Sequence, residues 1–174
     1  MHRFWKFMSV LIVQLLPAYL AALPLEPVRM RFLAETEVVV PGEPFEVGAY
    51  FEIDPPWHIY WKDPGDAGLP TKLSLTVPDG FGSGPIQWPS HKQFTQPGGI
   101  IGYGYDANVL FPAQISPPTS LSLGAEIHIK LKASWLRCSP TLCVPGKASE
   151  EITLTVGSKS KPIHQDLFRE APSY

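Results

Sequence analysis

The chain has 174 residues, of which 17% are charged, and its formal net charge is −2. It therefore carries no basic field that could hold nucleic acid, and we exclude nucleic acids as partners. About 150 residues remain after the N-terminal segment described next, which is enough for one domain with a sizeable core of its own.

The first residues have the layout of a secretory signal peptide. His2, Arg3 and Lys6 precede an apolar run that extends over residues 7–22. An uncleaved membrane anchor is the competing interpretation, but the run is shorter than the ~20 apolar residues of a spanning helix. We predict a signal peptide at 1–23, a single domain at 24–157 and a polar tail or start of a linker at 158–174, with export to the periplasm.

The rest of the chain favours strands over helices. Its 20 prolines and 14 glycines leave little room for long helices. Several short segments alternate apolar and polar residues, as half-buried strands do. The segments that we predict as strands are 28–33, 36–40, 45–53, 71–77, 107–115, 126–134 and 150–156. They favour an all-β fold, an immunoglobulin-like antiparallel β-sandwich, with a closed barrel as the alternative.

Two segments are predicted as long, aromatic-rich loops. Residues 54–70 and 87–105 combine Trp and Tyr side chains with many Pro and Gly residues. Loops of this length in a compact domain are usually functional or disordered, and the aromatic content argues against disorder. The alternative is that the aromatic side chains close the open ends of the sandwich as part of the core.

The chain has two cysteines, Cys138 and Cys143, with four residues between them. In an exported protein such a pair is expected to form an internal disulfide. As a structural cross-link it would stabilise little, about 2 kcal/mol for a loop of about six residues. Arg137 and Lys147 flank the pair, and nearby cations stabilise a thiolate. We therefore favour reversible thiol-disulfide exchange, with Cys138 as the attacking thiol and Cys143 as the resolving one.

Other kinds of site have weaker support. The pair does not form the Cys-x-x-Cys motif of thioredoxin-like sites, and no strand-helix-strand pattern surrounds it. The histidines lack the spacing of metal ligands, so we expect no metal site and no cofactor. The main alternative function is an exported immunoglobulin-like binding module with a structural disulfide and aromatic binding loops.

Three parts of the sequence resemble one known family. They are the segment WHIYWKDPGDAGLP at 57–70, the segment GYGY at 102–105, and Trp135-Leu136 before Cys138 with Pro145 after Cys143. Together they resemble the amino-terminal periplasmic domain of the DsbD and ScsB family of transmembrane disulfide reductases. The resemblance covers about residues 28–156.

The resemblance implies an immunoglobulin-like domain that relays electrons. Its two cysteines would receive electrons from a membrane domain, in the same or a separate chain, and pass them to periplasmic thioredoxin-fold and cytochrome c maturation proteins. His58 and Tyr60 stand where the DsbD branch has tyrosines near the disulfide. A cap loop that shields the pair in the family matches residues 88–105, with Phe94, Tyr103 and Tyr105 as its aromatic residues.

Overall fold

The computed structural model describes residues 26–96 and 98–170. The predicted signal peptide at 1–23 lies outside the described residues. The strands are β1 (Val28–Ala34), β2 (Val38–Val39), β3 (Phe45–Ile53), β4 (His58–Gly65), β5 (Lys72–Thr76), β6 (Gly82–Ser83), β7 (Lys92–Gln96), β8 (Ile100–Tyr105), β9 (Val109–Ser116), β10 (Glu126–Cys138) and β11 (Cys143–Val156), followed by one short helix, α1 (Gln165–Arg169). None of the described helical residues forms a segment long and apolar enough to cross a membrane.

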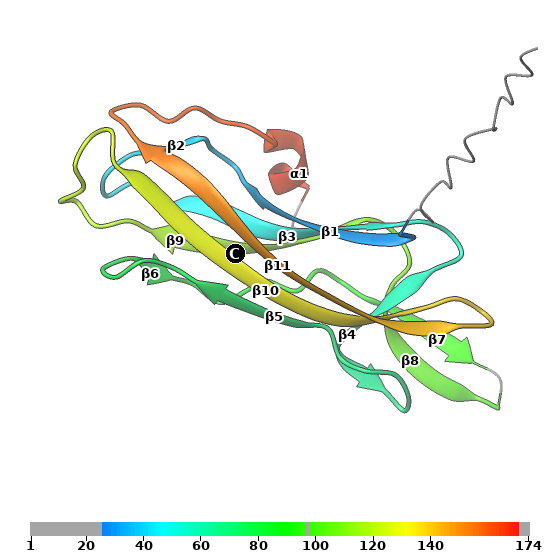
Figure 1. Cartoon of the computed structure of the whole chain (residues 1–174). Helices are drawn as coiled ribbons and strands as arrows, with labels where there is room; N and C mark the ends of the chain where they lie inside the picture. Colours follow the sequence, from blue (N-terminus) through cyan, green and yellow to red (C-terminus); the bar gives the residue numbers. More distant parts are fainter. Residues whose placement is uncertain (1–25, 97, 171–174) are drawn as a thin grey trace, which may run out of the picture.

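The strands form two sheets that lie against each other as a sandwich (Figure 1). One sheet has the order β1-β3-β9-β6, and the other has the order β2-β11-β10-β4-β8-β7, with β5 also pairing with β10. The pairs are antiparallel except for β2 and β11, which run parallel. The predicted all-β, immunoglobulin-like sandwich is confirmed, and the sheets do not close into a barrel.

The core lies between the two sheets and follows from the alternation in the sequence. Along β10, every second residue from Ile127 to Trp135 is buried, while the residues between them face solvent. Phe51 of the facing sheet packs edge-on against Phe111 and against Trp135, with ring centroids 5.7 Å and 5.0 Å apart. Burial of each such side chain contributes roughly 1.5–3 kcal/mol to folding.

The two segments predicted as loops contain three strands. Residues 54–70 include β4, and residues 87–105 include β7 and β8. In β8 the strand pattern is interrupted by glycines, which the structure requires. A Cβ atom on Gly104 would lie 2.0 Å from the carbonyl oxygen of Ile59. Gly104 therefore allows β8 to pair closely with β4, whereas in the sequence alone a glycine at this position indicates the end of a strand.

The C-terminal segment also packs onto the domain. Phe168 of α1 is buried against Leu33 and Leu110 on the outer side of the β1-β3-β9 sheet. Thr36 forms an isolated bridge with Pro162. The part of the predicted tail up to residue 170 thus covers one face of the sandwich, although its sequence is polar.

The hairpin of β10 and β11 runs along the whole length of the molecule (Figure 1). Its register is unbroken from Glu126 opposite Thr155 to Cys138 opposite Cys143. At its tip, β10 also pairs with β4. The hairpin therefore places both cysteines at the end of the sandwich where β4, β7 and β8 are paired.

Candidate functional site

The cysteine pair lies at the last rung of the long hairpin. Cys138 and Cys143 are directly opposite each other, with Cα atoms 4.1 Å apart, and they form a disulfide. The four-residue turn beyond them is closed by the Ser139 N–H, which donates to the Leu142 carbonyl at 2.8 Å. The Ser139 hydroxyl oxygen accepts a further bond from the Leu142 N–H at 3.2 Å. The predicted internal disulfide is confirmed.

The two sulfur-bearing residues differ sharply in exposure. Cys138 is only 2% exposed, whereas Cys143 is exposed to solvent. The sheet order explains the difference, because β10 lies between β11 and β4 at this end, while β2 pairs with β11 only at its far end. Cys138 is thus an inner-strand residue, and Cys143 belongs to the strand on the outside.

A pocket of about 450 Å³ lies beside the disulfide. It is lined by both cysteines and the turn between them, by His58 and Tyr60 of β4, and by Phe94 and Gln96 of β7. His58 is directly opposite Cys138 in the β4–β10 pairing. The hairpin of β7 and β8 therefore covers the same face of the sheet that carries the buried sulfur.

Two contacts hold β7 over this pocket. The ring of Phe94 lies 4.9 Å from that of His58, measured between centroids. The side-chain amide of Gln96 donates a hydrogen bond of 2.9 Å to the Tyr60 hydroxyl oxygen. Gln96 was not identified from the sequence, although its position two residues after Phe94 in an alternating strand would place both on one face.

His58 is a half-buried histidine with an unusual environment. Its Nε2 atom is buried and has no hydrogen-bond partner among the described residues. Burial lowers the pKa of His58, and the nearby Asp106 carboxylate opposes this shift. The neutral imidazole is therefore favoured at pH values around neutrality.

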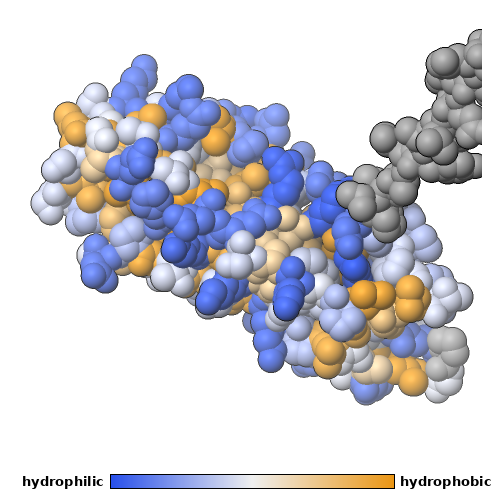
Figure 2. Space-filling view, viewed as in Figure 1, coloured by the Kyte–Doolittle hydropathy of each residue, from blue (hydrophilic) through white to orange (hydrophobic). Residues whose placement is uncertain are grey.

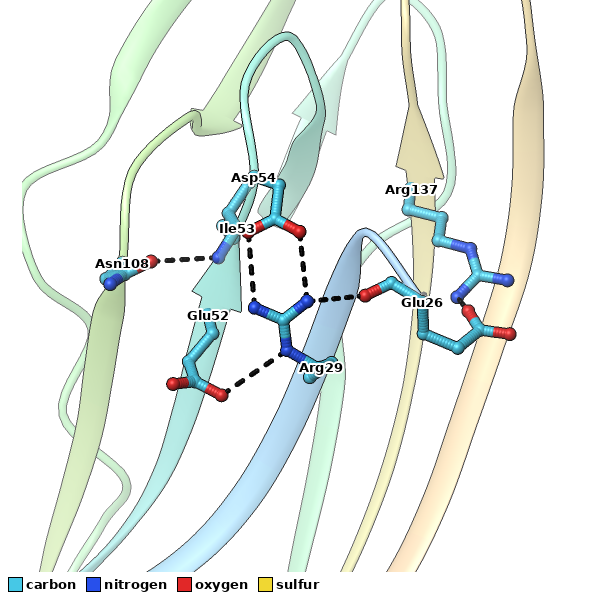
Figure 3. A network of polar contacts seen from close by, with 7 residues as sticks. All are labelled: Glu26, Arg29, Glu52, Ile53, Asp54, Asn108 and Arg137. Atoms are coloured by element: carbon cyan, nitrogen blue, oxygen red, sulfur yellow. Dashed lines mark hydrogen bonds and ion pairs between the residues drawn. The ribbon is translucent and has the colours of Figure 1, made fainter. Parts of the chain in front are cut away.

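Arg137 is turned away from the sulfurs. Neighbouring residues of a strand point to opposite faces, so Arg137 shares the face of Trp135 and not that of Cys138. Its guanidinium forms an ion pair with Glu26 (Figure 3). Lys147 is opposite Ser134, four rungs down the ladder from the disulfide. Neither cation that the sequence places near the pair lines the disulfide pocket.

Figure 3 shows that Arg137 belongs to a polar network at the edge of the sandwich. Arg29 donates to the Glu26 carbonyl at 2.7 Å and to the Asp54 carboxylate at 2.9 Å. The Arg29 guanidinium holds the pKa of Asp54 below its usual value. This network joins β1, the end of β3 and the tip region of β10, so the structure gives Arg137 a bracing contact and not a sulfur contact.

The three predicted cap aromatics have different surroundings. Phe94 lines the disulfide pocket. Tyr103 packs against His91 with ring centroids 5.3 Å apart, on the other face of the β7–β8 hairpin. Tyr105 is buried in the core, donates its hydroxyl to the Pro89 carbonyl at 2.9 Å, and has its pKa raised by burial. Of these three, only Phe94 is placed to cover the pair.

The sequence profile described as "Thiol:disulfide interchange protein DsbD, N-terminal" matches residues 29–155. The chain belongs to this family. The match contains the hairpin up to the penultimate residue of β11, with both cysteines, and the strands that cover them, β4, β7 and β8. No curated protein matches the sequence.

The fold is similar to that of a solved domain. The N-terminal periplasmic domain of ScsB from Proteus mirabilis is 20% identical, with a TM-score of 0.54, over 85% of this chain and 53% of that one. The chain thus spans about half the length of that structure. The DsbD n-terminal domain of Neisseria meningitidis in the reduced form is 17% identical, with a TM-score of 0.35, over 76% of this chain and 90% of that one.

Proposed function

We propose that this domain is a periplasmic thiol-disulfide relay that works through Cys138 and Cys143. It would receive electrons from a membrane reductase domain, in the same or a separate chain, and pass them to exported thioredoxin-fold proteins, including those of cytochrome c maturation. The main support is the disulfide at the hairpin tip, which has one exposed and one buried member beside an aromatic-lined pocket.

The exposure of the two residues favours one order of attack. In the reduced protein, the Cys143 thiolate attacks the partner disulfide and forms a mixed disulfide. The Cys138 thiolate then attacks the Cys143 sulfur, which restores the internal disulfide and releases the reduced partner. This order is opposite to the one that the sequence suggests, because Arg137 faces away from the sulfurs and Cys143 is the accessible residue.

The surface around the pair fits transient docking of another protein. Leu142, next to Cys143, is 54% exposed, and Ile100 at the start of β8 is also exposed. Figure 2 shows apolar colour at the end of the molecule where the hairpin tip and β7–β8 lie. Exposed apolar residues next to a reactive group are typical of interaction sites.

The reduction potential tests the relay function against the alternative of a binding module with a structural disulfide. The purified chain is equilibrated in glutathione buffers of graded ratio, and the fraction of reduced Cys138 and Cys143 is measured by alkylation. We expect a midpoint above about −300 mV, because inert structural disulfides fall below that value. A midpoint far below it, with partner binding retained in the Cys138→Ser/Cys143→Ser double variant, would contradict the relay.

The position of Phe94 predicts that it limits access to the disulfide. In Phe94→Ala, we expect dithiothreitol to reduce the disulfide about tenfold faster, because access controls the rate of thiol-disulfide exchange. Tyr103→Ala is the matched control, since it removes an aromatic ring from the opposite face of the same hairpin. Equal rates for wild type and Phe94→Ala would show that Phe94 does not shield the sulfurs.

A further inference from the structure

His58, whose role here rests on the proposed relay function, lies opposite the buried cysteine. Its Nε2 atom is buried without a hydrogen-bond partner among the described residues. A buried polar atom without a partner costs free energy, so its presence in a native structure needs an explanation. In the oxidised protein the neighbouring disulfide has no proton to share. After reduction, Cys138 carries a thiol, which can supply the missing partner.

The pairing of the strands brings the two side chains together. His58 and Cys138 are directly opposite each other on adjacent antiparallel strands. Side chains in such positions project from the same face, with Cβ atoms about 5 Å apart. Both residues line the same pocket. The imidazole is also held in place, since its ring packs against those of Tyr60 and Phe94, with centroids 5.2 Å and 4.9 Å away.

The resolving step has a chemical requirement that the site must meet. A thiolate is the nucleophile in disulfide exchange, and shielding from water disfavours the charged thiolate. Cys138 is shielded at 2% exposure, and Arg137 is directed to the opposite face of β10. A base beside Cys138 would therefore accelerate its attack.

We propose that His58 accepts the proton of the Cys138 thiol as Cys138 attacks the mixed disulfide at Cys143. In this step the S–H bond of Cys138 breaks and its proton passes to the imidazole. A bond forms between the sulfurs of Cys138 and Cys143, and the bond between Cys143 and the partner breaks. The electron pair of that bond leaves with the partner thiolate, so two electrons pass from the dithiol to the partner.

The surrounding charges give the direction of the pH dependence. Besides the cysteines, the ionisable groups that the described part of the chain places near His58 are Tyr60 on its own strand and Asp106 beyond β8, whose carboxylate is paired with Lys92 of β7 at 2.6 Å. Only a neutral imidazole can accept a proton. Resolution is therefore fast above the pKa of His58 and slows below it. At high pH, hydroxide removes the thiol proton, and the advantage of His58 disappears.

A reaction with an aromatic disulfide reagent allows the rates of attack and of resolution to be measured separately. The reduced full chain is mixed with an excess of 5,5′-dithiobis(2-nitrobenzoate) at several concentrations, and the coloured aryl thiolate is followed by stopped flow. Attack by Cys143 releases the first equivalent at a rate proportional to reagent concentration. Resolution by Cys138 releases the second equivalent at a rate independent of it. A wild-type protein that releases no second equivalent would overturn both the relay and the role of His58.

The variants then test His58 alone. At neutral pH, we expect His58→Phe and His58→Gln to slow the second phase about a hundredfold and leave the first unchanged, because neither side chain is a base. Glutamine keeps hydrogen-bonding capacity, which separates proton transfer from a structural role. Added imidazole should restore the second phase in His58→Ala. His91→Phe is the control, since His91 stacks on Trp61 at 4.0 Å and does not line the disulfide pocket. A second phase in His58→Gln with the wild-type rate and pH profile would overturn the proposal.

Discussion

Replacing Cys138 by serine is expected to trap a mixed disulfide on Cys143, whereas replacing Cys143 is expected to prevent its formation. The reason is access, because Cys143 is exposed and Cys138 is 2% exposed at the same rung of the hairpin. In Cys138→Ser, the first attack keeps its rate but no resolving thiol remains. In Cys143→Ser, the remaining thiol is shielded, and we expect attack to slow about a hundredfold.

Mass spectrometry of each variant after reaction with a disulfide-bonded thioredoxin-fold protein checks this result. The adduct mass should appear in Cys138→Ser and be absent in Cys143→Ser and in the double variant. The opposite pattern would restore the order that Arg137 suggests from the sequence. It would also require the β7–β8 hairpin to move away from the sheet before attack, because β7 covers the pocket in which Cys138 lies.

Replacing Phe51 by alanine is expected to cause a large decrease in the free energy of unfolding. The Phe51 side chain is fully buried and contacts both Phe111 and Trp135 edge-on. Removal of a buried phenylalanine ring leaves a cavity and costs about 3–5 kcal/mol. For a domain of this size, that loss corresponds to a decrease in melting temperature of roughly 10 °C.

Guanidinium unfolding of the oxidised protein, followed by tryptophan fluorescence, measures the effect. Phe81→Ala serves as the control, because Phe81 is only partly buried at the margin of the same core. The loss of stability in Phe81→Ala should be clearly smaller than that in Phe51→Ala. Equal losses for the two variants would mean that Phe51 does not hold the two sheets together. Trp135 lies three residues before Cys138 on β10, so this contact also anchors the strand that carries the buried cysteine.

The strands in which apolar and polar residues alternate regularly were predictable from the sequence. The alternation in 126–134 identifies β10 and its buried face, and the short spacing of Cys138 and Cys143 indicates a local disulfide. The strands β4, β7 and β8 were missed because proline and glycine lie within or around them, and both residues usually indicate turns and loops. In β8, however, glycine has a second use. At Gly104 it permits a close approach of two backbones, and this role depends on a partner strand that is distant in sequence.

The candidate site shows the same limit. Arg137 adjoins Cys138 in the sequence, but the period of two along a strand separates their side chains. That period was available from the sequence and would have placed Arg137 on the face of Trp135. The hydrogen bond from Gln96 to Tyr60 was not available, because it depends on how β7 folds over β4. Family resemblance, not local pattern, identified His58 and Tyr60.

The unbroken ladder behind the cysteines links redox state and folding in a defined way. We expect the pairs from Glu126 opposite Thr155 to Arg137 opposite Val144 to remain in the reduced protein, because their backbone hydrogen bonds do not involve the sulfurs. In a thermodynamic cycle, the free energy of unfolding that the domain gains on oxidation sets the difference in midpoint potential between the folded and the unfolded cysteine pair. For a loop of about six residues the entropic gain is about 2 kcal/mol, or about 40 mV for two electrons. Oxidised and reduced domains therefore differ in stability by about 2 kcal/mol, and we expect electrons to cycle through the pair without unfolding the hairpin.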